Sequence, residues 1–342
     1  MNPYKMVVAV ANQKGGCAKT TTAVNLAAAL AKGNPKFKVP PAKVLLIDLD
    51  PQGNCATSFG VEKKKIKKTA YDLLVNDSGE DLPLMDEYII SPAELTESMQ
   101  KAWSKRNDNS NRVPEDLSID NLWLLPSDIH LSGAEIELSH RIGRETRLRE
   151  ALAPIIDQFD HIIIDTPPSL GLLSINALCA ANWVFIPVQA EYYALEGFSM
   201  LMNSVKMIQK RINRNLKIFG VAMTMVDQRS KLSLHVCNEV QSKIPRKVFK
   251  TPIRRLAKVA EAAWTGAPTV ILNKPSKSGA GAGSREYWSL TKEYHERVQE
   301  MRRQFGVTEH PRLLLEKQGR SFDTVKKSLF WVVYCARTSS SL

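Results

Sequence analysis

The feature that most constrains this chain is a loop rich in glycine and lysine between an apolar run and an alanine-rich segment. The run covers residues 7–10, and residues 21–31 are expected to form a helix. Backbone N–H groups at such a turn, together with the dipole of the following helix, attract anions. The pattern therefore predicts a phosphate-binding loop whose members are Lys14, Gly15, Gly16, Cys17, Ala18, Lys19, Thr20 and Thr21.

Two residues of this loop have side chains suited to a bound nucleotide. Lys19 is placed to reach the outer phosphates, and the Thr20 hydroxyl is placed to bind Mg²⁺. The common P-loop pattern has glycine where this chain has Gln13 and Ala18, and it does not include a second lysine at the position of Lys14. If the backbone at residue 18 needs a positive φ, the Ala18 methyl group crowds a phosphate and lowers nucleotide affinity.

Two further apolar runs end in aspartates. Residues 44–47 precede Asp48 and Asp50, and residues 162–164 precede Asp165. In doubly wound sheets, ligands bind at the carboxyl ends of the strands, so these carboxylates are expected near the phosphate loop. Asp165 is predicted to bind the Mg²⁺ shell. Asp48 and Asp50 can lie on the same side only if the strand ends between them, because side chains alternate along a strand.

Short apolar runs alternate with longer helix-like stretches along most of the chain. Near-continuous Val, Ile and Leu runs are typical of buried parallel strands. The alternation predicts a single α/β domain with a doubly wound, mostly parallel sheet flanked by helices. The expected strands are residues 7–10, 44–47, 122–125, 162–164, 184–188 and 218–223, and the expected helices are residues 21–31, 133–140, 170–181, 195–212, 232–242 and 285–304.

Three polar stretches differ from this alternating pattern. Residues 63–68 hold five lysines, which favours a solvated helix start, with a phosphate contact as the alternative. Residues 76–118 are expected to be an insertion or mobile excursion. Residues 306–342 are expected to be a basic C-terminal tail of unknown structure, which leaves residues 1–305 as the main domain.

The overall charge restricts the class of partner. The chain has 342 residues and a net charge of +12, which favours a polyanion such as nucleic acid or an anionic membrane surface. Its five cysteines form no C-x-x-C pair, so they are expected to be reduced thiols in a cytoplasmic protein. No signal peptide is recognised, and no apolar run approaches the ~20 residues that a membrane span requires.

The loop with two lysines resembles the deviant Walker A motif of the ParA/MinD family of P-loop ATPases. Residues 44–54 resemble the second motif of that family, and residues 162–169 resemble its Walker B motif. Residues 187–197 are similar to its next strand and the turn that follows. In particular, these segments resemble Soj-like ParA partition ATPases, in the family's order and as far as about residue 305.

This resemblance implies an enzyme, an Mg²⁺-dependent ATPase that forms ADP and phosphate. Its cofactors are ATP and Mg²⁺, and its active form is a homodimer closed over two ATP molecules. Lys19 then acts on the nucleotide of its own subunit and Lys14 on that of the partner. Asp48 belongs to the metal site with Thr20 and Asp165, and Asp50 positions the attacking water. Pro252 falls in the segment that covers the adenine, although Thr-Pro-Ile-Arg-Arg departs from the family's pattern there.

The resemblance also implies partners. A Soj-like dimer binds double-stranded DNA non-specifically, and a ParB-like protein stimulates hydrolysis and release, which implies a cytoplasmic protein on the nucleoid. Binding of this kind uses phosphate contacts and no base readout. The candidate DNA-binding residues are Arg229, Lys247, Lys250, Arg254, Arg255 and Lys258.

Two other classes remain as alternatives. A MinD-like, membrane-associated positioning ATPase would need an amphipathic anchor, and residues 325–334 place lysines beside an apolar stretch. The strings Asp-Leu-Asp-Pro-Gln-Gly-Asn and Glu-Tyr-Tyr-Ala-Leu-Glu-Gly resemble Soj more than MinD, so membrane association is not expected. An electron-donating ATPase related to the nitrogenase iron protein needs paired cluster ligands, and Cys179 has no suitable second cysteine.

Overall fold

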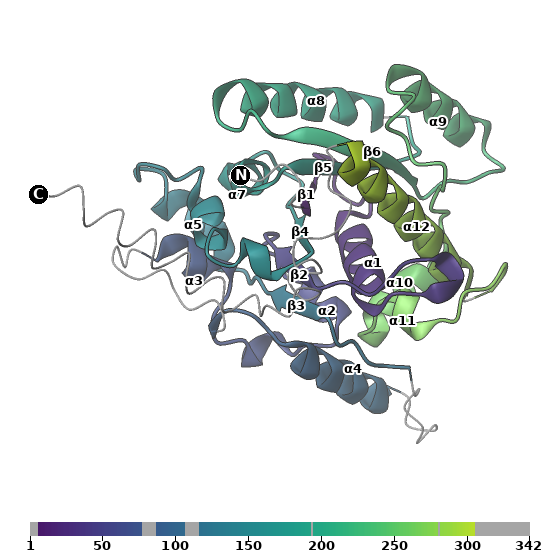
Figure 1. The fold of residues 1–342 in the computed structure, drawn as a ribbon, viewed down its shortest axis with the longest axis horizontal. Coiled ribbons are helices and arrows are strands. Elements are labelled where there is room, and N and C mark those ends of the chain that lie inside the picture. Colours follow the sequence, from purple (N-terminus) through teal and green to yellow (C-terminus); the bar gives the residue numbers. More distant parts are fainter. Residues whose placement is uncertain (1–5, 77–86, 107–115, 193, 280, 305–342) are drawn as a thin grey trace, which may run out of the picture. The chain divides into compact units, whose positions relative to one another are not determined.

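The structure is a computed structural model that describes residues 6–76, 87–106, 116–192, 194–279 and 281–304 (Figure 1). The chain divides into two units after Tyr294, and the domain bound expected at residue 305 stays a prediction. The first unit contains the sheet and the phosphate loop. In the described part of the chain, no helix is long and apolar enough to cross a membrane.

Six strands of the described residues form one parallel sheet, as the alternating sequence predicts. Their order is β3-β2-β4-β1-β5-β6, so the chain winds outward in both directions from the centre. The strands are β1 Met6–Val10, β2 Val44–Asp48, β3 Leu122–Leu125, β4 His161–Asp165, β5 Trp183–Gln189 and β6 Lys217–Thr224. This arrangement confirms the doubly wound fold.

Helices connect the strands and cover the sheet. In the described residues they are α1 Lys19–Lys32, α2 Asn54–Ser58, α3 Ala70–Val75, α4 Pro92–Arg106, α5 Leu131–Glu137, α6 Arg147–Leu152, α7 Leu172–Ala180, α8 Ala194–Arg211, α9 Lys231–Lys243, α10 Ala257–Thr265, α11 Thr269–Leu272 and α12 Gly281–Gln304. Short 3₁₀ turns lie at η1 Pro35–Phe37, η2 Lys63–Lys65 and η4 Ile156–Gln158. Figure 1 shows α1 beside the sheet and α8 along the β5–β6 edge.

The strands are buried on both faces. Val7 and Ala9 of β1 share a core with side chains of α7 and α8, and both are fully buried. Val8 and Val10, which alternate with them, are also fully buried and point to the opposite face. Helix α1 contacts β1, β2, β4 and β5. Burial of both faces explains why these strands read as continuous apolar runs.

The predicted excursion at residues 76–118 is in part a packed helix. Helix α4 covers Pro92–Arg106, and its Leu95 and Met99 are fully buried. Ile90 also forms an antiparallel bridge with Leu124 of β3. Only one narrow stripe of α4 is apolar, which is why its sequence reads as polar.

The lysines of η2 are exposed, as expected for a solvated turn. Residues 77–86, 107–115 and 306–342 lie outside the described residues.

Candidate nucleotide and metal site

The candidate site lies where β1, β2 and β4 end side by side. Strand β4 is hydrogen-bonded between β2 and β1, and the register pairs Asp165 with both Asp48 and Val10. The loop that follows β1 leads into α1 at Lys19. The structure therefore brings the phosphate loop and the predicted aspartates to one edge of the sheet.

Two residues of the loop have left-handed backbone geometry. Gly16 has φ 71°, and Ala18, directly before α1, has φ 66° and ψ 33°. Glycine adopts this region without cost, but alanine is strained there because its Cβ approaches the backbone. The positive φ at residue 18, which the sequence analysis gave as the condition for crowding of a phosphate, is thus present. Its methyl group occupies a position at which the common pattern has glycine.

The loop curls around the ammonium group of its second lysine. Lys19 is only 6% exposed, and its Nζ donates a hydrogen bond of 3.0 Å to the Lys14 carbonyl oxygen. The hydroxyl of Thr224, at the end of β6, donates to the Cys17 carbonyl oxygen at 3.0 Å. These contacts hold the loop and the Lys19 ammonium group in place. Thr20 and Thr21 lie half-buried in the first turn of α1.

The Lys14 side chain has a different partner from that of Lys19. Its Nζ lies 2.8 Å from Glu191 Oε2, in an ion pair that is part-exposed. Gln189 donates to Glu191 Oε1 at 2.6 Å, and an Arg255 guanidinium nitrogen lies 3.8 Å from the same oxygen. The Lys14 backbone N–H donates to Asn12 Oδ1. The two lysines of the loop therefore have separate environments.

Strand β2 ends between Asp48 and Asp50. The two side chains can therefore lie on the same side, as the sequence analysis required. Asp48 is the last residue of β2, and its Oδ1 accepts a hydrogen bond from the Asp50 N–H at 3.0 Å. Asp50 Oδ1 accepts from the Gln52 N–H at 3.0 Å, and its backbone carbonyl accepts from the Ser127 hydroxyl. Asp50 is 9% exposed, so it is the more accessible of the two carboxylates.

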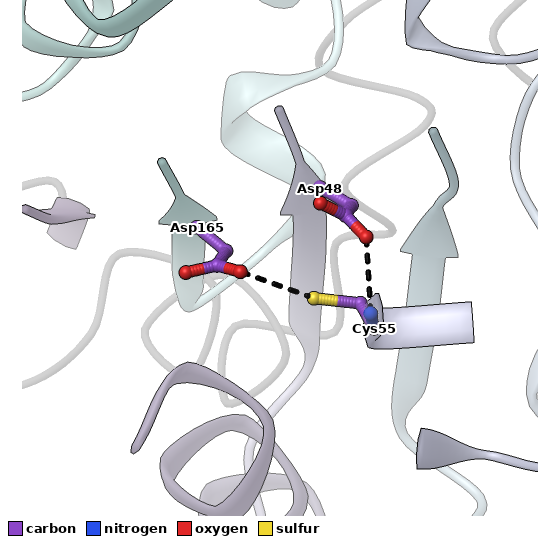
Figure 2. A group of neighbouring side chains, drawn as sticks. All are labelled: Asp48, Cys55 and Asp165. Atoms are coloured by element: carbon purple, nitrogen blue, oxygen red, sulfur yellow. Dashed lines mark hydrogen bonds between the residues drawn. The ribbon is translucent and has the colours of Figure 1, made fainter. Parts of the chain in front are cut away.

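Asp48, Cys55 and Asp165 form a fully buried cluster (Figure 2). The Cys55 N–H donates to Asp48 Oδ2 at 3.0 Å, and its thiol donates to Asp165 Oδ2 with an Sγ–O distance of 3.7 Å. Burial raises the pKa of Asp48 to about 6, while the N–H groups of Asp50 and Cys55 oppose the rise. Burial, and next the Asp48 carboxylate, raise the pKa of Asp165 well above its usual range.

The cluster fits a hard divalent cation such as Mg²⁺. Asp165 Oδ1 is buried and makes no hydrogen bond to any described residue, although the nearby Thr20 hydroxyl opposes the rise of the Asp165 pKa. A buried carboxylate oxygen without a partner is costly unless a cation or an ordered water faces it. Carboxylate and hydroxyl oxygens are the donors that Mg²⁺ prefers.

The predicted DNA-binding residues are spread over the segments that follow β6, from Arg229 to Lys258 in α10, and they are not equivalent. Arg229 is exposed, with a long 3.4 Å contact to Asp227, and Lys258 is exposed beside Glu261. Arg254 is half-buried, and both its backbone N–H and its guanidinium donate to Glu286. Among the remaining predicted residues, the structure places these on the exposed surface: Lys247, Lys250 and Arg255.

Pro252 lies in a segment that follows the β6 edge. The Ile253 N–H donates to the Met223 carbonyl, and Arg254 forms a parallel bridge with Val226. A cavity of about 380 Å³ is lined by Pro252 together with neighbouring polar side chains. The adenine contact predicted for Pro252 remains a prediction.

Sequence reasoning missed four residues that shape the site. Two of them contact the phosphate loop from the ends of other strands, namely Glu191 and Thr224, and Cys55 contacts the Asp165 carboxylate. The Asn12 side chain donates to the Pro187 carbonyl oxygen at 2.6 Å, which ties the start of the loop to β5. Glu191 is 177 residues from Lys14, and Cys55 is 110 residues from Asp165. Glu191 and Asn12 each follow the end of a strand by two residues, and Thr224 is the last residue of β6. This place at a strand end was the one available signal, and Cys55 had none.

The chain is similar to known P-loop proteins over most of its length. A family model described as an AAA domain matches residues 5–218. The sporulation initiation inhibitor protein Soj of Bacillus subtilis is 41% identical over 84% of this chain and 97% of its own. The chromosome partitioning protein ParA of Myxococcus xanthus is 36% identical over 85% of this chain and 88% of its own.

A solved structure also matches. Cobyrinic acid a,c-diamide synthase of Mycobacterium smegmatis, with a bound ATP analogue and magnesium, is 31% identical. The match has a TM-score of 0.63 and covers 84% of this chain and 92% of the other. The likeness therefore extends over the strands, loop and helix that build the site described above.

Proposed function

We propose that this chain, which belongs to the Soj/ParA family of P-loop ATPases, is an ATP-driven DNA-partition switch. The observation that supports this most directly is the separation of the two loop lysines. Lys19 is enclosed by its own loop, whereas Lys14 points outward to the part-exposed Glu191. One lysine is thus available to the subunit's own nucleotide and the other to a second subunit.

The phosphate loop and the Lys19 ammonium group that it encloses support nucleotide binding. Lys19 and the N–H groups at the start of α1 would neutralise the outer phosphates of ATP. Thr20 and Asp165 would hold Mg²⁺, with the unpartnered Asp165 Oδ1 facing the ion or a water bound to it. The ion, when bound, supplies positive charge to the β and γ phosphates.

Asp48 and Asp50 would have different roles in hydrolysis. Both carboxylate oxygens of Asp48 accept backbone N–H groups, so this residue shapes the turn and contributes negative charge beside the metal site. Asp50 has one oxygen bound to the Gln52 N–H, which leaves the other to orient the attacking water. Phosphoryl transfer depends mainly on such positioning and on neutralisation of charge.

Dimer closure is the step that couples ATP to DNA. In the dimer, Lys14 would leave Glu191 and contact the phosphates of the partner's nucleotide. Pairing two subunits doubles the number of basic residues that face DNA, and this raises both avidity and salt dependence. A ParB-like partner would then stimulate hydrolysis and release the dimer from DNA. The protein would accordingly act in the cytoplasm on the nucleoid.

The exposed basic residues beside β6 supply the proposed DNA contacts. Arg229 and Arg255 are 92% and 69% exposed at the side chain, so both can reach a phosphate. Arg254 is held by Glu286, so its substitution would disturb packing as well as charge. Because Arg229 would contact a single phosphate, its removal should lower the slope of log affinity against log salt by about 1.

A paired titration tests this function against its alternative. DNA binding is measured with ATP, with ADP and without nucleotide, beside the same titration on anionic vesicles. The proposal expects tight DNA binding with ATP alone and no nucleotide-dependent vesicle binding. Vesicle binding that requires ATP would favour a MinD-like protein instead. The segment on which that alternative depends, residues 325–334, lies outside the described residues.

A further inference from the structure

Cys55 contacts both buried carboxylates of the cluster in Figure 2. Its backbone N–H binds Asp48 and its thiol binds Asp165, and all three residues are fully buried. We infer that Cys55 is a positioning residue for the metal site, whose thiol fixes the rotation of the Asp165 carboxylate. This inference rests on the proposed Mg²⁺-ATP site, and it does not depend on DNA or on a partner protein.

The backbone around Cys55 is fixed independently of its side chain. Gly53, just before α2, has φ 61°, and its N–H donates to the Asp50 carbonyl at 2.9 Å. A Cβ at residue 53 would lie 2.7 Å from the Ser127 carbonyl oxygen, so only glycine fits this turn. The turn places Cys55, in the first turn of α2, beside the carboxylates at the ends of β2 and β4. The thiol is therefore presented to Asp165 by a rigid support.

The two carboxylate oxygens of Asp165 differ in their hydrogen bonding. Oδ2 accepts the hydrogen bond from Cys55, whereas Oδ1 has no hydrogen-bond partner among the described residues. One oxygen is thereby anchored and the other is free for the Mg²⁺ shell. Groups that orient a metal-binding carboxylate in this way commonly change metal affinity or activity 10–100-fold when removed.

Two substitutions at residue 55 separate orientation from packing. Cys55→Ala removes the donor, and Cys55→Ser keeps a donor of similar size. The measurement is the Mg²⁺ concentration needed for half-maximal binding of a non-hydrolysable ATP analogue at equilibrium. For Cys55→Ala we expect this concentration to rise about 10-fold or more. Binding of the analogue without Mg²⁺ should stay unchanged, and Cys55→Ser should resemble the wild type.

The matched control is Cys179→Ala, because Cys179 is another fully buried cysteine but lies in α7. It should leave the Mg²⁺ requirement unchanged. If Cys55→Ala needs no more Mg²⁺ than the wild type, or if a folded Cys55→Ser needs as much as Cys55→Ala, the inference is wrong. Should Cys55→Ala not fold, Cys55→Val, which also lacks a donor, takes its place in the comparison. A wild type that binds Mg²⁺ and nucleotide but not DNA would contradict only the partition proposal.

Discussion

Lys14 Nζ lies 2.8 Å from a carboxylate oxygen of Glu191, and Arg255 approaches the other oxygen of the same carboxylate at 3.8 Å. Exposed ion pairs of this kind contribute about 0–1 kcal/mol. Glu191 therefore orients Lys14 without locking it, and a phosphate can take the lysine away. Because Arg255 shares the same carboxylate, movement of Lys14 also changes the charge around a candidate DNA contact.

Replacement of Lys19 tests the phosphate-binding loop. Lys19→Ala removes the ammonium group that the loop encloses, and charge-assisted hydrogen bonds to phosphate are among the strongest in proteins. We expect tight Mg²⁺-ATP binding to be lost while the fold is retained. Calorimetric titration with ATP gives the affinity, and circular dichroism checks the fold. Wild-type affinity in this variant would remove the assignment of the loop.

Replacement of Asp50 separates binding from hydrolysis. Asp50→Ala should still bind ATP and form the dimer, because Asp50 lies outside the phosphate loop. Hydrolysis should nearly stop, since no carboxylate then orients the attacking water. The DNA-bound dimer should accumulate with ATP, which phosphate release and DNA retention assays measure together. Normal turnover would assign the role to Asp48 or to another residue.

Ala18 offers a substitution that should improve the site. Its φ of 66° is in the region that glycine occupies freely, and left-handed geometry costs an L-residue roughly 1–2 kcal/mol. Ala18→Gly should raise stability by up to about 1 kcal/mol, after the larger chain entropy of glycine is subtracted. ADP should also bind more tightly, since the methyl group no longer crowds a phosphate. Weaker ADP binding would show that the methyl group does not limit affinity.

The buried Asp48 predicts a pH dependence of stability without metal and nucleotide. Its pKa in the folded protein is about 6, above the ordinary 3.8, so the folded state retains a proton that the unfolded state has lost. The stability contributed by this residue is present below about pH 4 and is lost as the pH rises to about 6. A pKa rise of this size corresponds to roughly 3 kcal/mol.

Asp48→Asn removes the titratable carboxyl group, so the stability of this variant is compared with that of the wild type. Relative to the wild type, the variant should become progressively more stable between about pH 4 and about pH 7. Urea unfolding of both proteins at several pH values gives the difference. A difference that is constant across this range would show that Asp48 is not held in a desolvated site. Burial, and next the Asp48 carboxylate, raise the pKa of Asp165 as well, so the substitution also lowers the pKa of Asp165.

The sheet could be predicted from the sequence because each strand is buried on both faces. The predicted strands at residues 44–47 and 162–164 agree closely with Val44–Asp48 and His161–Asp165. Helix α4 was missed because only a narrow stripe, with Leu95 and Met99, packs inward. Its other residues are polar, and the pattern resembled that of a loop.

The phosphate loop and its aspartates were predicted because a local pattern encodes them. The contacts of Cys55 and Glu191 were not, since each depends on a turn that brings distant segments together. The Cys55 thiol contacts Asp165 because the turn at Gly53 brings Cys55 to the end of β4, and no local pattern indicates that contact. The orientation of Lys14 likewise depends on Glu191, just after the end of β5 and 177 residues away.

The central claim is that Lys14 acts across a dimer interface, and Lys14→Ala tests it most directly. The measurement is the molecular mass by light scattering with ATP, joined to DNA binding at two salt concentrations, with the exposed Lys64→Ala as control. We expect the Lys14→Ala protein to bind ATP as a monomer, not to hydrolyse it, and to bind DNA weakly with a shallow salt dependence. Lys64→Ala should behave like the wild type. A Lys14→Ala protein that dimerises with ATP and coats DNA normally would contradict the account.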